Sequence, residues 1–85
     1  MTITILYFAG LRETLGTQRE TLELPGHIGT AAQLRAWLRE RGGPWAEALA
    51  EGRAIRIAVD QAMARPDTPL HAGAEVAFFP PVTGG

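Results

Sequence analysis

The chain contains no cysteine, serine, lysine or asparagine. Without cysteine it can form no disulfide, thiolate metal site or thiol nucleophile. Without serine and lysine as well, the candidates for nucleophilic catalysis are threonines, carboxylates, two histidines and Tyr7. A self-contained active site is therefore hard to assemble from these residues.

Excess charge and long apolar runs are also lacking. The net charge is −1, which argues against a nucleic-acid binder because neutralising phosphates requires clustered basic residues. No apolar run approaches the roughly 20 residues of a membrane span. The opening run 3–6 has no basic region before it, as a signal peptide would. We therefore expect a cytoplasmic protein that binds neither nucleic acid nor membrane.

The polar residues that could serve a metal or an acid–base site are isolated. His27 and His71 lie in segments rich in proline and glycine, without ligand-like spacing. We expect both to be solvated loop histidines, and Asp60 and Asp67 to be turn residues. The sequence predicts no metal site.

Alternating apolar residues predict several strands. In the first, Ile3, Ile5 and Tyr7 share one face, while Leu6 and Phe8 lie on the other. Apolar residues on both faces indicate a central strand. The predicted strands span 2–9, 17–24, 55–59, a short segment around Met63, and 75–79.

One main helix is predicted between the second and third strands. Thr30 and Gln33 stand at the spacing of a capping box, and Gly42-Gly43 is expected to end the helix. Arg35 and Arg39 are expected on its water-facing side.

Two shorter segments complete the expected order. Residues 11–16 are expected to form a connector of about one helical turn, and residues 44–49 a second short helix. The chain thus reads as one domain over 1–85, an α+β fold with a mixed sheet of about five strands. The main helix should cover one face of the sheet.

The chain ends in Phe78-Phe79-Pro80-Pro81-Val82-Thr83-Gly84-Gly85. Glycines carry no side chain, so Gly84-Gly85 is the slimmest end that a polypeptide can offer to a narrow active site. Pro80 and Pro81 stiffen the approach by fixing φ. Residues 80–85 are therefore predicted to form a flexible functional tail.

The strand order and the tail together resemble the small sulfur-carrier subunit of molybdopterin synthase, a family with the ubiquitin-like β-grasp fold. The resemblance extends over the whole chain and includes Tyr7-Phe8-Ala9, Val59-Asp60-Gln61 and Glu75-Val76-Ala77-Phe78. One departure is Ala74, where the family often has an acidic residue. That residue acts as a turn device, so its loss does not affect the assignment.

The resemblance implies a two-stage chemistry at the C-terminus. An adenylating enzyme supplied with ATP would activate the carboxylate of Gly85, and sulfur would then replace one oxygen to give a thiocarboxylate. Gly84 and Gly85 would next enter the large subunit of a heterotetrameric synthase and donate sulfur to cyclic pyranopterin monophosphate. The chain would bind no cofactor stably and would be no enzyme on its own.

The resemblance also locates a docking surface. In a β-grasp fold the first and last strands are neighbours, so Phe8 and Phe79 should lie side by side on the sheet face away from the main helix. Met63 is expected to extend this apolar patch, and Arg12 to make a polar contact at its rim. Tail residues 80–83 would contact the partner too: Pro80, Pro81, Val82 and Thr83.

Three other functions stay open at this stage. The chain could be a protein modifier conjugated to lysines of other proteins through Gly85. It could be a sulfur carrier for thiamine or cysteine synthesis, whose members also end in Gly-Gly, although the Phe-Pro-Pro-Val run favours the molybdopterin version. It could also be an interaction module with an inert tail.

Overall fold

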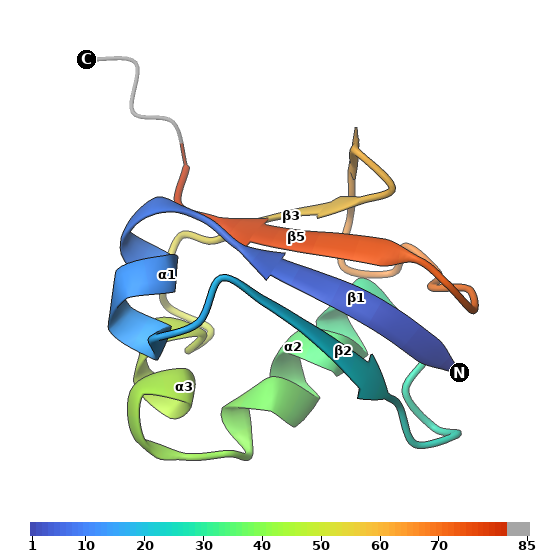
Figure 1. The fold of residues 1–85 in the computed structure, drawn as a ribbon, viewed down its shortest axis with the longest axis horizontal. Coiled ribbons are helices and arrows are strands. Elements are labelled where there is room, and N and C mark those ends of the chain that lie inside the picture. The colour runs from blue at the N-terminus through green and yellow to red at the C-terminus, as the bar shows by residue number, and fades with distance from the viewer. Residues whose placement is uncertain (82–85) are drawn as a thin grey trace.

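A computed structural model describes residues 1–81 of the chain. Within them, the strands form one mixed sheet in the order β2-β1-β5-β3-β4, with β1 and β5 parallel (Figure 1). The sheet agrees with the predicted one of about five strands. The elements are β1 (Thr2–Tyr7), α1 (Ala9–Leu15), β2 (Arg19–Glu23), α2 (Ala31–Arg39), α3 (Gly43–Ala48), β3 (Arg56–Val59), β4 (Ala62–Met63) and β5 (Glu75–Phe79).

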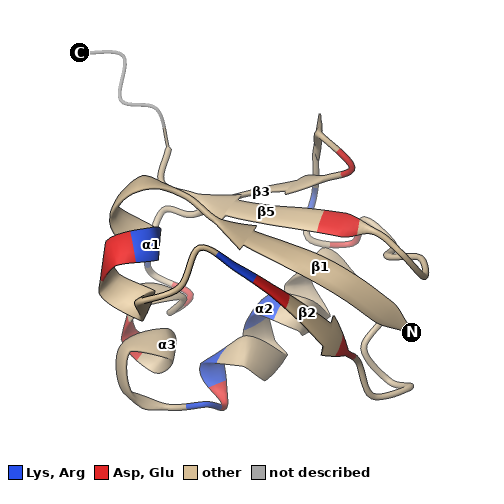
Figure 2. Cartoon of the chain, in the orientation of Figure 1, with Lys and Arg blue, Asp and Glu red and all other residues tan. Residues whose placement is uncertain are grey.

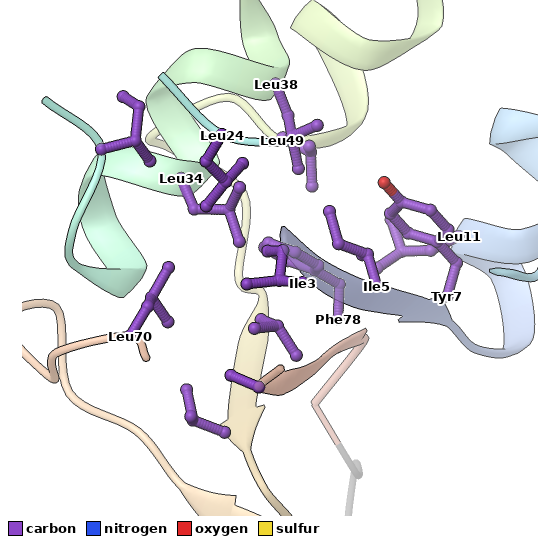
Figure 3. Packing of buried hydrophobic residues seen from close by; sticks show 14 of the residues in the cluster. Ile3, Ile5, Tyr7, Leu11, Leu24, Leu34, Leu38, Leu49, Leu70 and Phe78 are labelled. Carbon is purple, nitrogen blue, oxygen red and sulfur yellow. The ribbon is translucent and has the colours of Figure 1, made fainter. Parts of the chain in front are cut away.

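The alternation of apolar residues decides which face of the sheet is covered. Ile3, Ile5 and Tyr7 of β1 are at most 1% exposed, and α1, α2 and α3 all lie on their side of the sheet (Figure 1). Their side chains meet those of the helices in a single apolar core (Figure 3). Leu6 and Phe79, on the opposite face, stay only partly buried.

The first strand is shorter than predicted, and the segment after it is more helical. Phe8 is extended and precedes α1 as its N-cap residue, and Ala9 has a φ of 51°. Leu11 anchors α1 in the core with 7% exposure. Gly16 ends the helix with a φ of 72°, a left-handed conformation that costs glycine little. The predicted connector is therefore a helix from Ala9 to Leu15.

The main helix begins as predicted. The Thr30 hydroxyl accepts from the Gln33 N–H, and the Gln33 side chain accepts from the Thr30 N–H, which confirms the capping box. Leu34 and Leu38 are fully buried against the sheet. The helix ends before the glycine pair, at Arg39, and Gly42 instead precedes α3 with a φ of 75°.

Arg35 corrects one expectation about this helix. Its guanidinium is partly buried and donates to the backbone carbonyls of Leu49, at 2.8 Å, and of Ala50 and Arg53. Water does not surround it as predicted. Burial of the guanidinium, aided by nearby Arg39, lowers the pKa of Arg35. The Arg35 side chain thereby holds the segment after α3 against α2. It donates to backbone carbonyls that accept no hydrogen bond within a strand or helix.

The turn between β3 and β4 contains Asp60, one of the two predicted turn residues. Asp60 and Gln61 have φ values of 51° and 69°, the pattern of a two-residue hairpin turn with both central residues left-handed. The turn places Met63 on β4 opposite Ala58 of β3. After β4, a loop returns to β5 with Leu70 buried in the core.

No helix among residues 1–81 is long and apolar enough to cross a membrane.

Candidate functional site

An apolar row crosses the sheet on the face away from the helices. Strand register places Leu6 of β1 beside Ala77 of β5, Ala77 beside Ala58 of β3, and Ala58 beside Met63 of β4. Cross-strand partners share a face of the sheet. Met63 is 59% exposed. We call this side of the sheet the open face.

The two predicted phenylalanines form a second row on the open face. Tyr7 pairs with Phe78, so the next residues along these parallel strands, Phe8 and Phe79, lie next to each other. The Phe8 N–H donates to the Phe78 carbonyl at 3.1 Å, which holds the register beyond the end of β1. Phe8 is 45% exposed. The expected adjacency is therefore present, while a docking role for this row remains a prediction.

Arginines border these apolar rows at three places. Register pairs Arg56 of β3 with Phe79, and Arg19 of β2 with Leu6. Arg12 lies on exposed α1, one turn after Phe8. Figure 2 shows charged residues on α1 and β2, whereas β1 carries none. The open face thus carries an apolar strip with arginines near Leu6, Phe8 and Phe79, while Glu23 and Glu75 lie at the other end of the same face.

Of these three arginines, the sequence indicated only Arg12 as a residue at the border of the apolar patch; Arg19 and Arg56 were not predicted there. The strands holding these two arginines were predicted, but the pairing register that brings them beside Leu6 and Phe79 was not. The alternation of Arg56 with the inward residues Ile57 and Val59 would have placed Arg56 on the open face.

The tail leaves the sheet beside the phenylalanine row. Pro80 and Pro81, which we call the tail root, are half-buried and follow β5 directly. Pro81 lies between two hollows, one of about 670 Å³ and one of about 610 Å³, which share the wall residues Ala54 and Ile55. The predicted functional residues Val82, Thr83, Gly84 and Gly85 lie outside the described residues.

Tyr7, which was among the possible nucleophiles, is held in a buried cluster of hydrogen-bonded and aromatic side chains. Its hydroxyl donates to Glu20 at 2.8 Å, and Arg41 donates to both oxygens of that carboxylate. The Arg41 guanidinium lies 4.4 Å from the centre of the Trp45 ring. Burial, with the hydrogen bond to Glu20, raises the pKa of Tyr7 far above its usual range. Tyr7 therefore stays neutral and serves packing.

The titratable pair on the surface lies far from the tail root. His71 Nε2 contacts Asp60 Oδ2, and the Glu75 N–H donates to Asp60 Oδ1 at 3.0 Å. The Glu75 N–H, followed by His71, holds the pKa of Asp60 below its usual range. Asp60, and then the Ala72 carbonyl, raises the pKa of His71. Because Glu75 begins β5 and Pro80 follows its end, this pair is a strand length away from the tail.

The described residues thus offer a surface and a tail root, and no assembled catalytic group beside them. Histidine, cysteine and acidic residues form no group of three that could hold a metal within residues 1–81.

The architecture is that of the ubiquitin-like β-grasp fold: a mixed sheet with parallel first and last strands in its middle, covered on one side by helices. The chain belongs to the ThiS family, whose model matches residues 5–85.

Similar proteins match this chain over nearly their full lengths. The chain is 42% identical to the molybdopterin synthase sulfur carrier subunit of Escherichia coli K12, covering 98% of this chain and 99% of that one. The crystal structure of SAMP1 from Haloferax volcanii superposes with a TM-score of 0.77 at 25% identity, with full coverage of both chains. A chain of the complex of subunits 1 and 2 of molybdopterin-converting factor from Helicobacter pylori gives 0.68 at 23% identity, again with full coverage of both chains.

Proposed function

We propose that this chain is the sulfur carrier of molybdopterin synthase and that its C-terminal carboxylate, on Gly85, is the carrying group. Membership of the ThiS family and the Escherichia coli relative support this proposal. The observation that carries it is the position of the tail root. Pro80 follows Phe79 directly, so the tail leaves from the apolar row that a partner would cover.

The chemistry requires activation because an α-carboxylate with a pKa near 3.5 is ionised and a poor electrophile at neutral pH. An adenylating enzyme would join a Gly85 carboxylate oxygen to the α-phosphorus of ATP and release pyrophosphate. A sulfur nucleophile would then displace AMP at the carbonyl carbon, which leaves a thiocarboxylate. This chain contributes the acyl carbon, while its partners contribute the nucleotide site and the catalytic groups.

Transfer of sulfur requires reach. The six residues from Pro80 to Gly85 span up to about 20 Å when extended. A large subunit docked on the open face could therefore receive the thiocarboxylate in a buried pocket, where cyclic pyranopterin monophosphate would accept the sulfur. Pro80 and Pro81 reduce the entropy that the tail loses on insertion.

Deleting Gly85 tests this proposal. The deletion moves the reacting carbon back by about 3.5 Å, which is far outside productive geometry. We expect normal folding and docking, but neither thiocarboxylate nor product in a reconstitution with the activating enzyme, the large subunit, ATP and a sulfur source. Intact mass reports the thiocarboxylate. Product formation at the wild-type rate by the truncated chain would contradict the carrier mechanism.

A second candidate is a protein modifier, favoured by the likeness to SAMP1, a small archaeal modifier protein. A modifier would join its Gly85 carboxylate to a lysine of another protein, which gives a product larger by the mass of the target. A carrier gives only the replacement of one oxygen by sulfur. Co-purification separates carriers of different pathways, because the protein that binds the chain identifies the pathway. That protein would be the large subunit of molybdopterin synthase, an enzyme of thiamine synthesis or an enzyme of cysteine synthesis.

A further inference from the structure

The larger hollow beside the tail root is a groove between α2 and the hairpin of β3 and β4. We call it the basic groove. Ala36 of α2, Ile57 of β3 and Ala64 after β4 contribute apolar surface to it. Four arginines line it, against a single carboxylate, that of Glu51; the arginines are Arg35, Arg39, Arg56 and Arg65.

Two of these arginines already have partners. Arg35 donates to three backbone carbonyls, as described above. Arg39 forms an ion pair with Glu51, with 3.6 Å between a guanidinium nitrogen and a carboxylate oxygen. For Arg56 and Arg65, the structure of residues 1–81 shows no side-chain hydrogen bond or ion pair, and both residues are exposed. Among residues 1–81, the groove therefore presents two positive charges without an ion-pair partner, although the whole chain carries a net charge of −1.

The basic groove is continuous with the proposed docking surface. Arg56 lines the groove and also stands beside Phe79 on the open face. Met63 lines the groove and ends the apolar row that begins at Leu6. Pro81 of the tail root lines it as well. A protein that covers the open face would therefore reach the mouth of the groove at the edge strands.

We propose that the basic groove receives an acidic segment of the protein that docks on the open face. The proposal rests on the proposed function for the identity of that protein, the large subunit of molybdopterin synthase. Carboxylates of the segment would pair with Arg56 and Arg65 while its apolar side chains cover Ile57. Arginine suits this role because its planar guanidinium binds a carboxylate through two parallel hydrogen bonds.

Charge reversal at Arg65 tests the groove. Arg65 lies in the loop after β4, so Arg65→Glu leaves the phenylalanine row untouched. Arg53→Glu is the matched control, because it changes the net charge equally at an exposed arginine that lines the smaller hollow and not the basic groove. We expect Arg65→Glu to weaken binding of the large subunit roughly tenfold at low salt and less at high salt, and Arg53→Glu to change it by less than about twofold.

Two results would overturn the proposal. One is equal binding by the Arg65 and Arg53 variants at low salt. The other is a shift of the Gly84 and Gly85 amide signals by Arg65→Glu in the free chain, since the groove would then hold the chain's own C-terminal carboxylate. Phe8→Ala, measured in parallel, separates the two proposals. If it weakens binding while Arg65→Glu does not, the groove proposal alone fails.

Discussion

Phe8 and Tyr7 are adjacent aromatic residues with opposite environments. Tyr7 is 1% exposed and Phe8 is 45% exposed. Full burial of a phenylalanine side chain contributes about 1.5–3 kcal/mol to folding, and Phe8 gives up part of this. Single exposed apolar residues are common, but Phe8 lies beside Phe79, with Met63 exposed on the same face. This grouping favours docking over chance.

Truncating the phenylalanines should weaken docking without unfolding the chain. Phe8→Ala and Phe79→Ala should each cost more than about 1 kcal/mol of binding free energy for the large subunit, as central aromatic anchors do. Isothermal titration measures the affinity, and circular dichroism checks the fold. Phe8→Leu is the control, because it keeps apolar area at the site. Unchanged affinity in both alanine variants would rule out this docking face.

At the scale of elements, the hairpin of β3 and β4 is joined to the loop before β5 by one titrating contact. Asp60 lies in the hairpin turn, where it accepts from His71 and from the N–H of Glu75, the first residue of β5. Both side chains are exposed, so the contact belongs to the surface and contributes modestly. It also gives a reason for Asp at the first position of the turn beyond its tolerance of positive φ.

This contact predicts a pH dependence of stability. Because the pKa of folded His71 is raised, its contribution is complete below 6.5, the usual histidine value, and is lost as the pH rises through the folded value. Because the pKa of folded Asp60 is lowered, its contribution is complete above 3.8 and is lost as the pH falls through the folded value. The contact is therefore strongest between about pH 4 and 6.5.

Replacing the histidine measures the effect. His71→Gln should lower the free energy of unfolding more at pH 5 than at pH 9, because His71 loses its charge as the pH rises through its raised pKa. Urea denaturation at both values provides the comparison. His27→Gln, in another loop and likewise exposed, is the control. An equal effect of His71→Gln at both values would contradict a charged contact.

Local patterns predicted most elements, because each depends on residues close in sequence. Thr30 with Gln33 marked the start of α2, and Asp60 marked a turn. The length of helix α1 was underestimated because Phe8 provides no side-chain cap that would mark its start. Burial of Leu11 in tertiary contacts stabilises this helix instead. Two features depend on tertiary structure, so local patterns could not show them. One is the set of contacts that Arg35 makes with distant carbonyls, and the other is the register that brings Arg56 beside Phe79.

At the scale of the whole molecule, the core and the proposed tail are separate. The radius of gyration is 12.0 Å, about what a compact domain of this length has. The buried cluster extends from Ile3 in β1 to Phe78 in β5 and includes residues from every helix. The core is thus complete before the tail root begins.

A chain that stops at Pro81 should therefore fold as well as the full chain. We expect its free energy of unfolding in urea to agree within about 0.5 kcal/mol, because no core residue is removed. A chain that stops at Ala77 is the contrast: it loses Phe78 and should be strongly destabilised. A clear loss of stability in the chain that ends at Pro81 would mean that residues 82–85 take part in the fold.

The parallel pairing of the first and last strands also affects how the chain is made. Phe8 and Phe79 come from opposite ends of the sequence, and β5 lies between β1 and β3 in the sheet. During synthesis, β1 must wait for β5 to leave the ribosome, and contacts so distant in sequence slow folding. A chain that ends before Phe79 has neither a complete sheet nor a complete phenylalanine row. Partners that recognise this row would thus reject chains that stop before β5 is complete.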